Sequence, residues 1–135
     1  MKKLFFFALV LLKGCSPCPA AEIAAKEAAR AIIGEAASEN YQTKLAIASA
    51  IRNRGTLAGV LGYRNWKMVA RQPESVFEAA NRAWSESKTN NTVHGATHFE
   101  CRRFKTPYWA RRLKPVATVG RFDFYKLENS TADKR

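Results

Sequence analysis

Two adjacent runs of helix-forming residues constrain the fold more than any other feature. Residues 22–38, EIAAKEAARAIIGEAAS, are almost all helix formers, and residues 41–54, YQTKLAIASAIRNR, resume the pattern after the polar break SEN. Arg52 and Arg54 give the second run a basic end, and Gly55 follows as a C-cap. Because the link is so short, we expect two helices packed as an antiparallel or angled pair.

The rest of the chain changes from helical to extended patterns. A short helix is expected around residues 66–71, and PESVFEAANRAWSES predicts a third long helix over residues 73–87. Residues 96–101, ATHFEC, alternate as in a strand, and residues 116–127 indicate a bent strand or a hairpin around Gly120. Helices followed by a small sheet predict an α+β domain, with a helical N-terminal part and a small C-terminal β-sheet.

The first twenty residues have the order of a secretory signal peptide. A basic head, MKK, precedes the apolar run LFFFALVLL and the small-residue exit KGCSPCPA. The run is shorter than the roughly 20 residues that a membrane-spanning helix needs. We expect residues 1–20 to be removed by cleavage after Ala20. A lipoprotein signal with lipid on Cys15, or an N-terminal core helix, are the alternatives.

The net charge limits the classes of binding partner that we expect. Loss of Lys2, Lys3 and Lys13 with the signal peptide would lower the formal net charge from +12 to +9. Such a surplus favours polyanions: nucleic acid, anionic lipid or the anionic polymers of a bacterial envelope. Export argues against nucleic acid, and the basic residues are scattered, so we expect no nucleic-acid partner. Contact with a membrane is expected only through the signal peptide or a lipid on Cys15.

Other chemistries find little support. His94, His98, Glu100 and Cys101 could bind a metal, but on an extended strand Cys101 points away from the histidines. A Ser-His-Asp triad would depend on Asp123, and no nucleophile elbow is present. We therefore expect no metal and no cofactor. A mature chain with Cys101 as its one cysteine has no internal disulfide.

Glu35 is the acid whose surroundings suggest chemistry. It shares one stripe of the first helix with Ala28 and Ile32, and Gly34 beside it leaves room for close approach. Burial in an apolar pocket raises the pKa of a glutamate and keeps it protonated, as a general acid requires. The alternative is a solvated helical charge, which is the usual state of a helical glutamate.

Four separated motifs carry a resemblance to a known family. The stretches AIIGEAASENYQTKLAIASAIRNR, GATHF, PYWA and VATVGRFDFYK resemble, in this order, the catalytic domain of SleB-type cell wall hydrolases. The resemblance covers about residues 24–126 and implies a lysozyme-like fold, with a catalytic domain at 21–128 and a flexible tail at 129–135. The chain departs from the family at residues 56–93, and Phe122 stands where relatives often carry His.

The resemblance implies cleavage of the MurNAc–GlcNAc β-1,4 bond of peptidoglycan by a lytic transglycosylase. The Glu in GEA, Glu35, would protonate the glycosidic oxygen and then, as a base, close a 1,6-anhydro ring. Glu39, one turn further on, and His98 would support it. The residues expected to line the glycan groove are Tyr41, Tyr108, Trp109, Arg121 and Tyr125.

We expect the mature protein to be an exported monomer in the periplasm or cell envelope that acts on peptidoglycan glycan strands. The alternative is a basic envelope protein that binds peptidoglycan without cleaving it. Both proteins would use the same groove, so only cleavage of the bound glycan strand distinguishes the enzyme from the binding protein.

Overall fold

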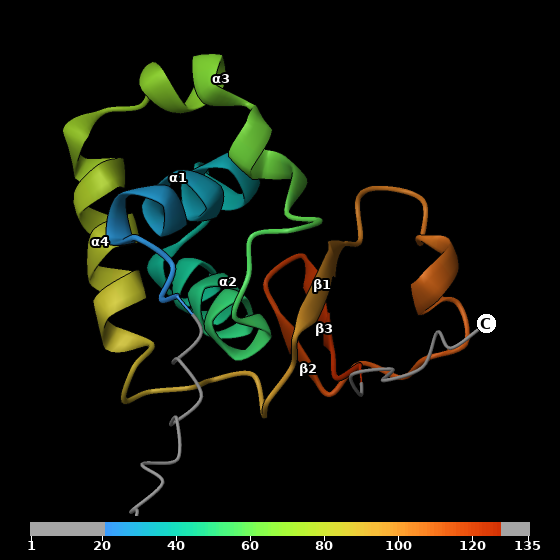
Figure 1. Cartoon of the computed structure of the whole chain (residues 1–135). Coiled ribbons are helices and arrows are strands. Elements are labelled where there is room, and N and C mark those ends of the chain that lie inside the picture. The colour runs from blue at the N-terminus through green and yellow to red at the C-terminus, as the bar shows by residue number, and fades with distance from the viewer. Residues whose placement is uncertain (1–20, 128–135) are drawn as a thin grey trace, which may run out of the picture.

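The computed structural model describes residues 21–127, so the expected signal peptide (1–20) and the tail (129–135) lie outside the described residues. Four α-helices precede a small three-stranded antiparallel sheet, which confirms the expected α+β class (Figure 1). The elements are α1 (Ala25–Ala36), α2 (Tyr41–Arg54), η1 (Leu61–Arg64), α3 (Trp66–Ala70), α4 (Glu74–Glu86), β1 (His98–Cys101), η2 (Tyr108–Ala110), β2 (Ala117–Val119) and β3 (Phe122–Tyr125).

Local capping explains where helix α2 begins and ends. The Asn40 side chain accepts a hydrogen bond from the Thr43 backbone N–H at 2.9 Å and so caps α2. Gly55 adopts φ +75° and donates its N–H to the Ile51 carbonyl at 3.0 Å, which closes α2 as predicted. The buried Lys44 ammonium donates to the carbonyls of Ala37 and Glu39. It thereby satisfies carbonyls in the α1–α2 turn.

Helix α2 forms the centre of the molecule. Every residue from Thr43 to Ile51 is buried, and α2 contacts both helices α1 and α4 and strands of the sheet. A helix that is buried on all sides lies inside the domain, between other layers. Figure 1 shows α1 and α4 on one side of α2 and the sheet on the other. The largest fully buried side chains are Phe124, Ile32, Ile33, Leu45, Ile47 and Ile51.

The sheet has the order β1-β3-β2, and both pairs are antiparallel. His98 pairs with Tyr125 at one end of the β1–β3 ladder, and Cys101 pairs with Phe122 at the other. The predicted hairpin around Gly120 is confirmed, with φ +57° at that residue. Within residues 21–127, no helix is long and apolar enough to cross a membrane.

Candidate active site

A cavity of about 480 Å³ lies where the helical part meets the sheet. Its walls come from the end of α1, the end of α2, the loop before η1, β1 and the segment at η2. Within the described part of the chain, Glu35 is the one carboxylate that lines it. Residues that line the cavity include Glu35, Arg54, Leu61, His98, Phe99 and Trp109.

Two glycines bring a backbone N–H to the carboxyl group of Glu35. A Cβ on Gly34 would collide with the carbonyl of Gly62, and a Cβ on Gly62 would lie 2.7 Å from the Glu35 nitrogen and 2.9 Å from its Cδ. Because neither position carries a side chain, η1 packs directly on the last turn of α1. The Gly62 N–H then donates to Glu35 Oε1 at 2.7 Å.

The surroundings of Glu35 favour its protonated form. Burial raises the pKa of Glu35 above its ordinary value, and the hydrogen bond from the Gly62 N–H offsets part of this effect. The bond occupies Oε1, so Oε2 is the oxygen free to carry a proton. A half-buried carboxyl held in this way has the properties of a general acid.

His98 and Trp109 line the cavity on the sheet side, and Tyr125 packs behind Trp109. The rings of His98 and Trp109 meet edge to face at 5.4 Å between centroids, and Trp109 meets Tyr125 at 5.3 Å. Burial, followed by the positive charge of Arg54, lowers the pKa of His98, so this ring is neutral near pH 7. Burial and the hydrogen bond to Glu100 raise the pKa of Tyr125 to about 12.

Arg54 is a cavity residue that sequence reasoning assigned only to the basic end of a helix. Its guanidinium lies close to Gly59, where a Cβ would come within 2.6 Å of Nη2. Burial lowers the pKa of Arg54, although a guanidinium remains charged. Basic residues are common at the C-terminal ends of helices, so the sequence around Arg54 gave no sign that it would line the cavity.

Comparison with solved structures places the fold. No protein-family model and no curated protein matches the chain. The catalytic domain of the Bacillus cereus SleB protein matches with a TM-score of 0.56 at 22% identity, over 76% of this chain and 88% of that one. The catalytic domain of the germination-specific lytic transglycosylase SleB from Bacillus anthracis matches with a TM-score of 0.58 at 22% identity, over 76% and 93%.

The chain has the SleB catalytic-domain fold. In this SleB-like fold, three of the expected site residues line one cavity: Glu35, His98 and Trp109. Tyr125 is buried behind Trp109, with its hydroxyl donating to Glu100 at 2.8 Å. Tyr108 precedes Trp109 but does not line the cavity, and it is 86% exposed.

Three expected residues lie elsewhere in the SleB-like fold. Helix α1 ends at Ala36, so Glu39 is not one helical turn beyond Glu35, and that geometric expectation was wrong. Glu39 forms an ion pair with Arg121, and neither lines the cavity. Tyr41 donates to Glu86 and lies under the guanidinium of Arg82 at 4.1 Å, also outside the cavity.

The structure also reassigns Gly34 and Phe122. The space beside Gly34 is filled by the Gly62 backbone, so it is not a gap for the sugar. Phe122 is 2% exposed and packs edge to face on Phe99 at 6.2 Å, which makes it a core residue of this SleB-like fold. Its side chain does not line the cavity, so the position where the sequence was expected to depart from the family lies outside it.

Proposed function

We propose that the protein is a peptidoglycan lytic transglycosylase that cleaves the MurNAc–GlcNAc β-1,4 bond with Glu35 as its single general acid and base. The observation that carries the proposal is the half-buried Glu35, which is the one carboxylate of residues 21–127 that lines the cavity and is held by the Gly62 N–H. The SleB catalytic-domain fold supports the same substrate, since one of the similar structures is described as a lytic transglycosylase.

The chemistry follows from the two protonation states of one carboxyl group. Neutral Glu35 donates the proton on Oε2 to the glycosidic oxygen, and the C1–O bond of the muramyl residue breaks. The resulting carboxylate removes the proton from the C6 hydroxyl as that oxygen bonds to C1. The 1,6-anhydro ring closes, Glu35 is protonated again, and no water is consumed. The Gly62 N–H stabilises the carboxylate between the two steps.

A single carboxylate distinguishes this route from ordinary glycoside hydrolysis. Retaining and inverting glycosidases use a second carboxylate, at separations of about 5 Å or about 6.5–9.5 Å. Among residues 21–127, no second carboxylate lines the cavity: Glu39 pairs with Arg121, and Glu100 accepts the Tyr125 hydroxyl. The intramolecular C6 hydroxyl therefore suits the cavity better as the nucleophile than an activated water does.

The remaining cavity residues have binding roles. Trp109 offers a planar aromatic face for a sugar ring, and Arg54 offers a fixed positive charge for a lactyl or peptide carboxylate. Neutral His98 can donate or accept a hydrogen bond to a sugar hydroxyl. We place the enzyme outside the cytoplasm as a monomer, in the periplasm or cell envelope.

Digestion of peptidoglycan tests the proposal. Purified protein is incubated with intact sacculi, and mass spectrometry identifies the soluble fragments. The expected products carry 1,6-anhydro ends and are lighter by one water than hydrolytic products. Fragments with reducing ends would instead indicate a hydrolase. Intact sacculi that retain the protein would indicate a binder without catalysis.

The decisive variant is Glu35→Gln. It keeps an oxygen for the Gly62 N–H but has no proton to give, so fragment release should fall by about 10²–10⁴-fold. Circular dichroism checks that the variant is folded. Glu39→Gln is the matched control, because Glu39 lies outside the cavity. Wild-type rates in the Glu35 variant would refute the mechanism.

A further inference from the structure

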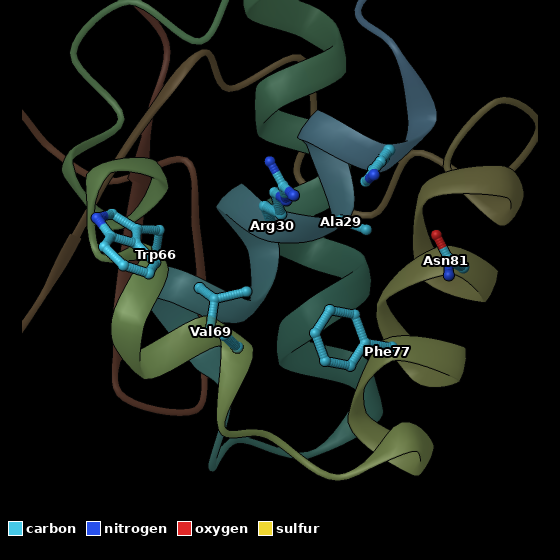
Figure 2. Close-up of a pocket in the computed structure, with 8 residues that line it drawn as sticks. Ala29, Arg30, Trp66, Val69, Phe77 and Asn81 are labelled. Atoms are coloured by element: carbon cyan, nitrogen blue, oxygen red, sulfur yellow. The ribbon is translucent and has the colours of Figure 1, made fainter.

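A second cavity lies between α1, α3 and α4, away from Glu35. Its volume is about 650 Å³, and it shares no lining residue with the Glu35 cavity. In Figure 2, Trp66 of α3 and Phe77 of α4 lie on either side of Val69, with Ala29 and Arg30 of α1 nearby. A concave space of this size is typical of a small-molecule site.

The floor and one wall of this cavity are apolar. Ala29 and Val69 are buried, Phe77 is half-buried, and the Trp66 side chain is 65% exposed beside them. Scattered exposed apolar side chains are normal, but an indole that walls a concave apolar surface marks a place where a ligand gains by burial.

The rim of the cavity is positively charged. Lys26 and Arg30 are one helical turn apart on α1, and both line the cavity. No carboxylate of residues 21–127 lies within 4.0 Å of either side chain, and no acidic residue lines the space. Lys67 does not line the cavity, but its Nζ lies 5.7 Å from the Trp66 ring centroid.

The remaining polar group is the amide of Asn81 on α4 (Figure 2). In the described part of the chain, no hydroxyl-bearing side chain lines the cavity. The planar fork of Arg30 can pair with both oxygens of a carboxylate, and Lys26 supplies a second cation. These groups therefore suit a carboxylate that is attached to an apolar body.

We propose that this cavity binds an amphipathic carboxylate, in which the carboxylate adjoins a compact apolar group. Arg30 and Lys26 pair with the carboxylate, while Trp66, Val69 and Phe77 enclose the apolar group. Two natural sources share this chemistry: a free fatty acid, and the acidic peptide stem of peptidoglycan with its alanine methyl groups. The proposal does not depend on catalysis at Glu35.

Calorimetric titration of the purified chain tests the site. The probes are decanoate and a synthetic peptide, L-alanyl-D-glutamyl-L-lysyl-D-alanine, each compared with its amidated counterpart, which has no carboxylate. At least one carboxylate should bind saturably with one ligand per chain, and its amide should not. Binding of decanoate alone assigns the site to lipid, and binding of the peptide alone assigns it to the cell wall.

Variants locate the binding. Arg30→Gln should weaken it about tenfold, which corresponds to the loss of one charge-assisted pair. Arg103→Gln removes the same charge from an exposed position outside both cavities, and it should leave the affinity within about twofold. Glu35→Gln should also leave it unchanged, which separates this site from the proposed catalytic cavity.

Three results would overturn the proposal. In the first, neither carboxylate saturates the protein. In the second, the amides bind as well as the acids. In the third, Arg103→Gln weakens binding as much as Arg30→Gln, which would reduce the effect to the general attraction of a basic protein for anions.

Discussion

Burial of the Glu35 carboxyl group determines how readily it loses its proton. Burial raises its pKa, so a larger fraction of Glu35 is protonated at a given pH than for a surface glutamate. Because the proposed mechanism begins with the protonated acid, we expect the rate to fall as pH rises through this raised pKa. This fall is the alkaline limb of the pH–rate profile. Measuring fragment release from sacculi between about pH 4 and about pH 8, at constant ionic strength, locates the limb.

The control for the pH profile is His98→Asn. His98 lines the same cavity, and burial and Arg54 lower its pKa, so its titration must be separated from that of Glu35. The variant should keep the limb even if its rate is lower. A limb that disappears with His98 would assign the titration to the imidazole instead of Glu35.

Glu35 should also affect the free energy of unfolding. A carboxyl with a raised pKa binds more protons in the folded than in the unfolded state, so its contribution to stability falls as pH rises from the unfolded pKa through the folded one. Glu35→Gln removes the buried charge and keeps an acceptor for Gly62. The variant should therefore be more stable than wild type at neutral pH, with less gain at acid pH.

Urea denaturation at several pH values measures this effect. Glu78→Gln is the matched control, because it removes the same negative charge from an exposed position on α4. A stability difference for Glu35→Gln that stays constant with pH would show that ionisation of Glu35 is not the cause.

At the scale of elements, the contact between α1 and η1 decides where the Glu35 carboxyl points. Gly62→Ala would place a Cβ 2.5 Å from the Gly34 carbonyl carbon, so η1 must move away and the hydrogen bond to Glu35 is lost. We expect a loss of about 1–3 kcal/mol in stability from overpacking, and a fall of about 10²-fold in rate from misplacement of the acid.

Gly55→Ala is the control for this substitution. Gly55 has φ +75°, but no atom lies within 4 Å of an added Cβ, so only backbone strain of about 1 kcal/mol is expected. Thermal denaturation should show both variants as destabilised, whereas peptidoglycan digestion well below the transition should separate them. Equal activity in the two variants would show that the position of η1 does not affect catalysis.

The elements could be predicted because their signals are local. Asn40 and Gly55 mark the ends of α2, and the sequence around Gly120 predicts the hairpin. The contact between Gly34 and Gly62 could not be predicted, because it joins residues far apart in the chain and glycine has no side chain whose pattern reveals a partner. The same limit applied to Glu39, whose partner Arg121 lies on the distant hairpin.

The site was predicted in part for the same reason. Glu35, His98 and Trp109 belong to motifs with a recognisable order, and they line one cavity. Tyr41 was chosen for its aromatic ring alone, but the ring packs under Arg82 and its hydroxyl donates to Glu86. An aromatic residue can serve a groove or a surface cluster equally well, and only tertiary contacts distinguish the two.

For the whole molecule, the property that most affects binding to an anionic polymer is the excess of positive charge, which is +12 over the full sequence. A basic protein that acts on an anionic polymer gains much of its affinity from long-range attraction, which salt weakens because the Debye length falls from about 10 Å at 0.1 M to about 3 Å at 1 M. Stacking of Trp109 on a sugar is short-range and is far less sensitive to salt. Binding to sacculi should therefore consist of two separable parts.

Retention of the inactive Glu35→Gln protein on sacculi measures both parts. Raising NaCl from about 0.05 M to about 0.5 M should lower retention several-fold, with a residual fraction that remains bound. Trp109→Ala, made in the same background, should reduce retention by a similar factor at both salt concentrations, because the stacking contact is lost in each. Retention that is independent of salt would mean that the charge excess serves a partner other than the cell wall.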